Sequence, residues 1–288
     1  NAHVRNPLPA GRGKGSHMTI DFEGGTAVVT GSAGGIGLGI VRACIRRGMN
    51  VVLSDVDEAK LDSAVTDLVA DGAGAVGQAA DVRDPAQVAA LRDRALSDFG
   101  RVDLICNNAG IGLTRALVHV KPSDWDIVLD INVKGLANGI AAFLPLFDEQ
   151  GRGHVNSTSS LSGITADPEL GVYNASKFAV IGVMEALALE LADGPVSASV
   201  LCPGPVATDL LHSSAIHTGA GANEAVHAYL NQGLHPDDVG EVAVSGIAEG
   251  RFWLLTHPEL TNRLMSGRTA SMLDDGSLYV DPVEWIDQ

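Results

Sequence analysis

The chain has 288 residues, of which 45% are hydrophobic and 4% aromatic, and its formal net charge is −16. This length and apolar content allow one domain with a sizeable core. A surface this acidic repels phosphate backbones and anionic lipid, so we expect neither nucleic-acid nor membrane partners. No apolar run approaches the roughly 20 residues of a membrane helix.

The first residues are set apart by their composition. Residues 1–17 carry three basic side chains and no acidic one, and they lack the apolar core of a signal peptide. The run Gly15-Ser16-His17-Met18 looks like a cloning junction. We therefore expect residues 1–17 to be an expression leader and residues 18–288 to form a single oxidoreductase domain.

Cysteine and histidine spacing gives no sign of a metal site. Cys44, Cys106 and Cys202 have apolar neighbours, and no pair has metal-ligand or redox spacing. The nine histidines show no ligand spacing either. We therefore expect reduced core cysteines, a cytoplasmic protein and no metal.

Runs rich in β-branched residues alternate with helical stretches from residue 25 to about 256. Strands are predicted near residues 26–30, 51–54, 75–79, 103–106, 153–158, 196–201 and 252–256. Helices are predicted near residues 36–48, 58–70, 85–98, 122–149, 172–192 and 236–249. This alternation indicates right-handed parallel crossovers. The expected fold is α/β: a Rossmann-type, doubly wound parallel sheet of about seven strands in a single domain.

The first predicted strand runs into a glycine-rich loop, Gly31-Ser32-Ala33-Gly34-Gly35-Ile36-Gly37, and then into a helix. Gly31 permits a tight turn, Gly35 lets the backbone approach a pyrophosphate, and Gly37 lets helix and strand pack closely. The phosphates would meet the positive end of the helix dipole. We predict a dinucleotide site here, including Ser32 and Ile36.

The second predicted strand ends at Asp55, 24 residues after Gly31. A carboxylate there can accept hydrogen bonds from the ribose hydroxyls of the adenosine and would repel a 2′-phosphate. Asp55 could instead cap the next helix, but Asp57 suits that role equally well. Since neither the glycine loop nor Val56 offers an Arg or Lys, NAD is favoured over NADP.

The third predicted strand is followed by Asp81-Val82, where a polar side chain and a backbone N–H can meet the adenine edge. The alternative is that an aspartate caps the helix that begins at Pro85. Asp84 suits the cap better by position, which leaves Asp81 and Val82 as predicted cofactor residues.

Tyr173 and Lys177 lie four residues apart at the start of a predicted helix and therefore share one face. A phenol is a poor base at neutral pH, but a fixed ammonium and the positive nicotinamide of an oxidised cofactor favour the phenolate. Ser160 comes thirteen residues before Tyr173, just after a strand, and its hydroxyl could hold a substrate oxygen. Taken singly, Tyr173 and Lys177 are typical of a surface pair, and Ser160 is typical of a turn. Together, and in a chain that begins with a glycine loop, the three residues predict proton transfer.

The chain resembles the short-chain dehydrogenase/reductase family in its single-domain branch. The matching segments, in family order, are Thr30-Gly31-x-x-x-Gly35-x-Gly37, Asn107-Asn108-Ala109-Gly110, Asn132-Val133-Lys134-Gly135, Ser160, Tyr173-x-x-x-Lys177 and Pro203-Gly204-Pro205-Val206-x-Thr208. The resemblance implies that Asn132, Ser160, Tyr173 and Lys177 are catalytic. Asn132 would anchor a helix kink and a water that relays protons to Lys177.

The resemblance also implies further contacts with the cofactor. The residues that would line the cofactor groove are Asn108, Ala109 and Gly110. Those that would approach the nicotinamide are Tyr173, Lys177, Pro203, Gly204, Val206 and Thr208. From the residue pattern alone, Asn107-Asn108 is also typical of an Asx turn, and Asn132 of a buried polar group.

Two departures from the family pattern stand out. Ser160 lies in a cluster of serines, so Ser159 is an alternative, although the spacing to Tyr173 favours Ser160. The Asp-Gly-Gly segment that often follows the last strand in this family is replaced by Thr256-His257-Pro258-Glu259. That replacement weighs against the usual carboxyl-terminal tetramer packing and resembles a subgroup for bulky hydrophobic or aromatic alcohols.

Two segments interrupt the alternation of strands and helices. Residues 207–235 mix apolar side chains with Gly219 and Gly221, and we expect a helical substrate lid there; ordinary helical core fits the pattern equally well. Residues 257–288 are expected to form an irregular tail.

The predicted function is NAD-dependent interconversion of a secondary alcohol and a ketone on a hydrophobic or aromatic substrate. An NADPH-linked ketoreductase of acyl or polyketide metabolism would need a basic residue near Ser32 and Asp55. A catalytically inactive NAD-binding scaffold or redox sensor would not need Ser160, Tyr173 and Lys177 together. Family resemblance implies a homodimer or homotetramer that pairs the helices near 122–149 and 172–192.

Overall fold

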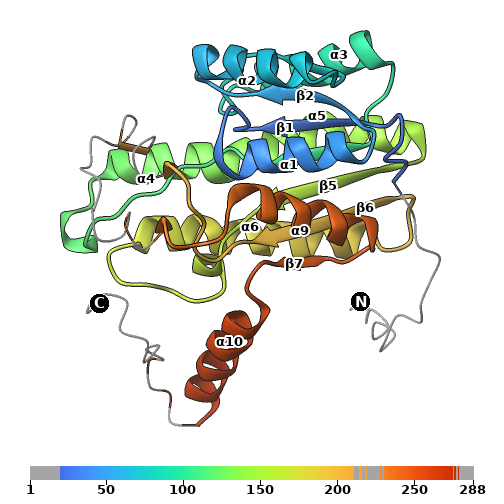
Figure 1. The fold of residues 1–288 in the computed structure, drawn as a ribbon. Coiled ribbons are helices and arrows are strands. Elements are labelled where there is room, and N and C mark those ends of the chain that lie inside the picture. The colour runs from blue at the N-terminus through green and yellow to red at the C-terminus, as the bar shows by residue number, and fades with distance from the viewer. Residues whose placement is uncertain are drawn as a thin grey trace, which may run out of the picture.

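Seven parallel strands form the centre of the fold, in the order β3-β2-β1-β4-β5-β6-β7 (Figure 1). The computed structural model describes residues 20–210, 214, 215, 218, 228, 230–274, 276 and 278. The strands are β1 Thr26–Thr30, β2 Asn50–Ser54, β3 Ala75–Gly77, β4 Leu104–Asn107, β5 Gly153–Thr158, β6 Val196–Cys202 and β7 Trp253–Leu255. The chain reverses its direction of strand addition between β1 and β4, which confirms the doubly wound, single-domain prediction.

Helices cover both faces of the sheet. On one side lie α1 (Gly35–Arg46), α2 (Glu58–Ala70) and α9 (Pro236–Ala248). On the other lie α3 (Pro85–Phe99), α4 (Pro122–Leu129), α5 (Gly135–Gln150) and α6 (Gly171–Glu190). Two aspartates begin helices as predicted, since Asp57 accepts from the Lys60 N–H at 3.1 Å and Asp84 from the Ala86 N–H at 2.9 Å.

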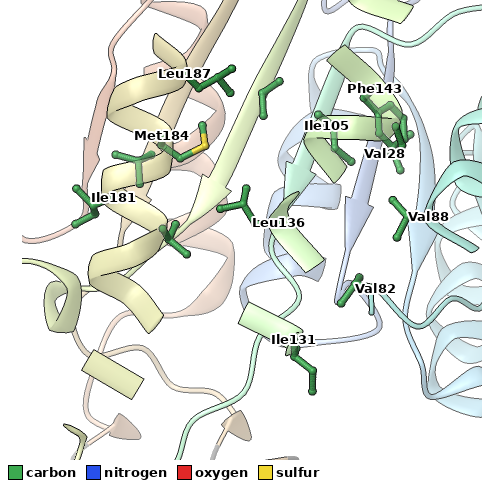
Figure 2. Close-up of a cluster of buried hydrophobic side chains, with 14 of the residues drawn as sticks. Val28, Val82, Val88, Ile105, Ile131, Leu136, Phe143, Ile181, Met184 and Leu187 are labelled. Atoms are coloured by element: carbon green, nitrogen blue, oxygen red, sulfur yellow. The ribbon is translucent and has the colours of Figure 1, made fainter. Parts of the chain in front are cut away.

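Alternate residues of the strands enter two separate cores. In β1, Val28 packs on the α3, α5 and α6 side, whereas Ala27 and Val29 pack on the α1, α2 and α9 side. Figure 2 shows the first core, where Phe143 of α5 and Met184 of α6 lie over the sheet. Strands buried on both faces need apolar residues at every position, which explains the continuous β-branched runs in the sequence.

The helix predicted over 122–149 is interrupted by a π-helical turn, η2, at Asp130–Lys134. The π turn separates α4 from α5 and contains Asn132. All other predicted helices and strands between residues 26 and 255 have boundaries within about two residues of the observed ones.

The irregular tail predicted from residue 257 is wrong for its first half, because Pro258–Leu273 forms a helix, α10. Pro258 occupies the first turn and Glu259 complements the helix dipole, which are ordinary helix-start signals. Only Thr261 and Leu264 of α10 are buried, so the helix has no continuous apolar stripe that periodicity could reveal.

Two helical stretches are as long and as apolar as membrane spans, which was not expected from the sequence. Pro122–Gln150 and Gly171–Glu190 have the length and composition of membrane spans, with mean hydropathies of 1.5 and 1.3 over their most apolar windows. Both lie against the sheet and contribute Phe143, Phe147 and Met184 to its core. Their apolar character is therefore that of core helices.

The lid predicted over 207–235 lies mostly outside the described residues, as does the leader over 1–17. The ends of the insertion are described, and they are joined to each other. The N–H of Leu234 donates to the Pro205 carbonyl, and the N–H of Ala207 donates to the Leu234 carbonyl, both at 3.0 Å. The insertion therefore begins and ends at one place, beside the carboxyl end of β6.

Candidate active site

Four groups of predicted site residues follow β1, β4, β5 and β6, which are neighbours in the sheet. Because the strands are parallel, their carboxyl ends lie at one edge. The glycine loop, Asn107-Asn108, Ser160 and Pro203 are consequently brought to the same edge, on both sides of the point where the strand order reverses. This is the position at which open α/β sheets bind ligands.

The glycine loop has the geometry that a pyrophosphate requires. Gly31 has φ +61°, and a Cβ there would lie 2.7 Å from Ala109 Cα. A Cβ on Gly37 would lie 2.1 Å from the Gly31 carbonyl oxygen, so helix and loop touch through glycine alone. Gly34 caps α1 without a side chain, and the first turn holds no acidic residue. The N–H groups at the positive end of α1 therefore fit an anionic group.

The side chain of Ser32, in the glycine loop, has a structural role. Its hydroxyl donates to the Val29 carbonyl at 2.8 Å and accepts from the Ser54 N–H at 3.0 Å, and the residue is buried. Only the backbone of Ser32 can therefore serve a cofactor, whereas Gly35 and Ile36 remain partly exposed.

Asp55 reaches from β2 to the glycine loop. Its Oδ2 accepts from the Ala33 N–H and its Oδ1 from the Asp57 N–H, both at 3.1 Å. The carboxylate thus stands beside the loop, where the ribose of an adenosine would lie in the predicted mode. Asp57 takes the helix cap, and the ribose contact of Asp55 remains a prediction.

Asp81 and Val82 have protein partners. The Asp81 carboxylate accepts from the Arg83 guanidinium at 2.5 to 2.9 Å. Val82 is buried against Gly135, and its carbonyl accepts from the Asn138 side chain at 2.8 Å. Contacts between these two residues and an adenine remain a prediction.

Asn108 ties three strand ends together. Its amide nitrogen donates to the carbonyls of Thr30 and Gly31 at 3.1 and 3.0 Å, and its Oδ1 accepts from the Thr158 hydroxyl at 3.0 Å. The Thr30 hydroxyl accepts from the N–H groups of Asn108 and Ala109. The predicted groove residues thus form the floor between the glycine loop and β5.

Tyr173, Ser160 and Lys177 meet at the start of α6. The Tyr173 phenol lies near the Ser160 side chain, which acts to lower the pKa of the phenol, and Lys177 Nζ lies 5.6 Å from the centre of the phenol ring. Lys177 is buried and donates to the Thr158 carbonyl at 2.9 Å. The sequence could not indicate that carbonyl, because a backbone acceptor has no residue signature.

Ser159, the alternative to Ser160, has a different partner. Its buried hydroxyl donates to the Lys177 carbonyl at 2.8 Å and so joins the end of β5 to α6. The Ser160 hydroxyl instead accepts from the Ser162 N–H at 3.1 Å and faces Tyr173. The geometry favours Ser160 as the residue that holds a substrate oxygen.

Asn132 lies in the π turn and holds the loop after β4. Its Oδ1 accepts from the Ile111 N–H at 2.8 Å, and its Nδ2 donates to the Ile111 carbonyl and to the Ser176 hydroxyl, each at 2.9 Å. A Cβ on Gly110 would lie 3.2 Å from Asn132 Oδ1 and 3.4 Å from Lys177 Nζ. Gly110 therefore lies between these two side chains, and a bulkier residue would separate them.

Burial dominates the acid–base properties of the site. It raises the pKa of Tyr173 to about 12, which the nearby Ser160 side chain only partly opposes. Burial also lowers the pKa of Lys177 to about 8. The protein's own groups thus keep the phenol neutral at neutral pH, and the predicted phenolate relies on the positive nicotinamide as well as on Lys177. A phenolate here requires a further positive charge.

The segment after β6 closes the site from the other side. The Pro203 carbonyl accepts from the Leu161 N–H at 2.9 Å, which joins this segment to the loop after β5. Thr208 Cγ2 would lie 3.4 Å from a Cβ on Gly35, so Thr208 faces the glycine loop. The Gly204 N–H donates to the Thr256 hydroxyl at 3.0 Å, a contact that the sequence did not indicate.

A small cavity of about 10 Å³ lies behind the site, lined in part by Asn107, Asn132, Ser157 and Thr158. This volume is about that needed for one water molecule. Among the described residues, no group of three His, Cys, Asp or Glu side chains is placed to hold a metal ion.

The fold and this edge define a dinucleotide-binding α/β protein with a Ser-Tyr-Lys group. Residues 25–218 match the short chain dehydrogenase family. A relative from Lactiplantibacillus plantarum, the CLA biosynthesis dehydrogenase/reductase, is 30% identical over 89% of this chain and 96% of its own. The 1-deoxy-11-beta-hydroxypentalenate dehydrogenase of Streptomyces avermitilis is 32% identical over 85% and 89%.

A solved structure supports the same assignment. A short chain dehydrogenase/reductase from Burkholderia phymatum, in complex with NAD, is 35% identical, has a TM-score of 0.86, and is matched over 91% of this chain and 99% of its own. The chain belongs to the short-chain dehydrogenase/reductase family and is an oxidoreductase of that family.

Proposed function

We propose that the protein is an NAD-dependent dehydrogenase that interconverts a secondary alcohol and a ketone. The observation that carries the proposal is the meeting of Ser160, Tyr173 and Lys177 beside a glycine loop that fits a pyrophosphate. The similar structure from Burkholderia phymatum holds NAD, and the named Streptomyces relative is a dehydrogenase of a hydroxylated compound.

When bound, NAD supplies the acceptor for the hydride and, in its oxidised form, a positive charge. In the oxidative direction Tyr173 accepts the hydroxyl proton of the alcohol while Ser160 holds the alcohol oxygen. Lys177, fixed on the Thr158 carbonyl, stabilises the phenolate. Asn132 and the water-sized cavity beside it offer a route for the outgoing proton.

NAD is proposed over NADP because of the charge beside the glycine loop. Asp55 points its carboxylate at the loop backbone, and a 2′-phosphate placed there would meet this negative charge. The loop itself, from Gly31 to Gly37, contains no basic residue that could compensate. An NADPH-linked ketoreductase therefore remains the less favoured function.

A hydrophobic substrate is proposed from the apolar rim of the site. Leu117 packs on Gly171, two residues before Tyr173, since a Cβ on Gly171 would lie 2.5 Å from a Leu117 methyl carbon. Leu117 and Val118 are nevertheless 61% and 84% exposed. An exposed apolar side chain at the start of α6, the helix that carries Tyr173, suits a bulky apolar or aromatic alcohol. A lid over 207–235 would add to this wall.

The deciding experiment is a screen of secondary alcohols, including aryl, steroid and terpenoid ones, for NADH formation by the purified protein. We expect turnover with a bulky apolar alcohol and a higher kcat/KM with NAD than with NADP. Tight NAD binding by calorimetry without turnover over the whole panel would indicate a scaffold or sensor. Faster ketone reduction with NADPH than with NADH would contradict the role of Asp55.

A further inference from the structure

Helix α10 leaves β7 and projects away from the sheet (Figure 1). The proposed function assigns no role to this helix or to the Thr256-His257-Pro258 segment that begins it. Two of its contacts nevertheless reach the loops that frame the reactive phenol.

The first contact is at the start of α10. The Thr256 hydroxyl accepts from the Gly204 N–H at 3.0 Å and lies 2.7 Å from His257 Nδ1. The His257 ring covers Gly204, where a Cβ would lie 2.5 Å from Nδ1. The helix is thus attached to the segment after β6.

The second contact is three turns further along the helix. Arg268 Nη1 donates to the Ile164 carbonyl at 3.0 Å, and the guanidinium carbon lies 5.0 Å from the centre of the Phe178 ring. Ile164 is the residue at the end of the short helix η3 (Leu161–Gly163), and Phe178 follows Lys177 directly. The helix is thus also attached to the loop after β5.

The loop from Ser160 to Ile164 is short, and its N–H groups from Leu161 to Ile164 are hydrogen-bonded. Ser160 begins η3 by accepting from the Ser162 N–H, and the Ile164 N–H donates to the Leu161 carbonyl at 2.8 Å. Gly163 is wedged against α6, where a Cβ would lie 2.6 Å from the Lys177 carbonyl oxygen. A single turn of this kind moves as a unit, so a displacement of Ile164 reaches the Ser160 hydroxyl.

We propose that α10 is a brace for the substrate side of the site and that Arg268 is a positioning residue for Ser160. The guanidinium holds the carboxyl end of η3, where backbone carbonyls attract a cation. It also packs on Phe178. The guanidinium therefore fixes η3 relative to α6, the helix that carries Tyr173 and Lys177. This inference rests on the proposed function, because it concerns the group that holds the alcohol oxygen.

The test compares Arg268→Met with Arg263→Met. Arg263, which is exposed like Arg268, lies five residues earlier on α10, about 140° around the helix. In Arg268→Met we expect kcat/KM for the alcohol to fall about tenfold, as for loss of one charged hydrogen bond, with the KM for NAD unchanged. Arg268→Lys, which keeps a cation and one donor, should recover part of the loss.

A measurement independent of substrate completes the test. Hydrogen exchange of the amides in residues 161–165 should become faster in Arg268→Met than in Arg263→Met, with similar melting temperatures. Unchanged exchange overturns the brace, and faster exchange with unchanged kcat/KM overturns the positioning role. An equal fall in both methionine variants overturns the assignment to Arg268. Failure of the proposed function itself is seen separately, as absence of turnover in the unmodified protein.

Discussion

Tyr173 and Lys177 lie in surroundings that destabilise both the phenolate and the ammonium. Burial raises the pKa of the phenol to about 12 and lowers that of the ammonium to about 8. At neutral pH the pair therefore carries the charge of the lysine and a neutral phenol. Proton removal from Tyr173 then depends on a second positive charge, which couples the proposed chemistry to the oxidised form of the cofactor.

Replacing Tyr173 with Phe removes the phenol oxygen and keeps the ring beside Lys177. We expect turnover to fall by about 10² to 10⁴, the usual contribution of a positioned proton-transfer group. Binding of NAD should change little, because the predicted pyrophosphate contacts lie at the start of α1. Initial rates and calorimetry with NAD measure the two effects. Near-normal turnover in the purified variant would remove Tyr173 from the proposed mechanism.

Asp55 offers a test of the cofactor with a control two residues away. Asp55→Asn keeps a side-chain oxygen for the Ala33 N–H and loses the negative charge beside the loop. We expect the ratio of kcat/KM for NAD over NADP to fall about tenfold or more, because repulsion of the 2′-phosphate is removed. Asp57→Asn alters the cap of α2 and should leave this ratio unchanged. Equal ratios in both variants would contradict the ribose role.

At the scale of elements, β5 and β6 are joined by a polar network of four side chains as well as by their backbone. The His154 ring lies between the Ser197 and Ser199 hydroxyls at 2.8 and 2.7 Å, and the Ser199 hydroxyl donates to Asn156 Oδ1 at 3.0 Å. His154 is 3% exposed, and burial lowers its pKa from 6.5 to about 3. The histidine is therefore neutral in the folded protein over the whole physiological range.

This depressed pKa predicts a loss of stability in acid. Below about pH 6.5 His154 is protonated in the unfolded chain but not in the folded protein. The free energy of unfolding therefore falls as the pH falls towards 3. The contribution of this one group is about 2 kcal/mol between pH 8 and pH 5. Urea unfolding of the protein and of His154→Gln at several pH values measures it.

The comparison with His154→Gln isolates the histidine, since all other acid-labile groups are common to both proteins. Glutamine can keep hydrogen bonds to the serines but does not titrate. The stability advantage of histidine over glutamine should therefore shrink as the pH falls below 6.5. A difference that stays constant from pH 8 to about pH 5 would show that His154 titrates normally in the fold.

The elements that the sequence predicted are those whose burial imposes a pattern. β1 is buried at every position, and its run of Ala and Val shows this directly. Helix α10 buries Thr261 and Leu264 alone and was not predicted, because a mostly exposed helix carries no apolar stripe. The π turn could not be seen in the residue pattern, since one residue inserted into a helix leaves composition unaltered, and only the family resemblance implied a kink at Asn132.

The grouping of the site residues was predictable from the sequence, as the buried elements were. Parallel strands bring their carboxyl ends together, so residues that follow different strands could be grouped from the sequence. The partners that hold these residues could not. The Thr158 carbonyl under Lys177 has no side-chain signature, and the contact between Arg268 and Ile164 joins residues 104 positions apart. Such contacts depend on packing that local pattern does not encode.

At the scale of the molecule, the two ends of the sheet differ in chemistry. The carboxyl ends carry glycines, open helix N–H groups and the Tyr173 phenol. The amino ends are tied by Asp103, which is buried, accepts from the Thr26 N–H at 2.9 Å and pairs with Arg101. The residues that fix the sheet and the predicted binding residues thus lie at opposite ends of the strands. N–H groups at the carboxyl ends can therefore stay available for a ligand while the amino ends hold the sheet together.

Helices α5 and α6 leave an apolar surface outside the core. Val183 and Leu189 of α6 are 36% and 66% exposed, and α5 exposes Ala137, Ala141 and Pro145 at a spacing of four residues. Small apolar side chains on neighbouring helices allow close packing of a second copy through the same surface. This surface belongs to the helices that family resemblance assigns to subunit pairing.

We therefore expect a dimer or tetramer that Val183→Glu dissociates into a smaller species, because the new carboxylate would be desolvated between two copies. Val69→Glu is the matched control: Val69 is 50% exposed on α2, on the opposite face of the sheet. Light scattering on a size-exclusion column distinguishes the outcomes. A single-chain mass for the unmodified protein, or equal assembly of both variants, would exclude α6 from the interface. Dissociation by Val69→Glu alone would instead place the interface on the other side of the sheet, where α1 and α2 lie.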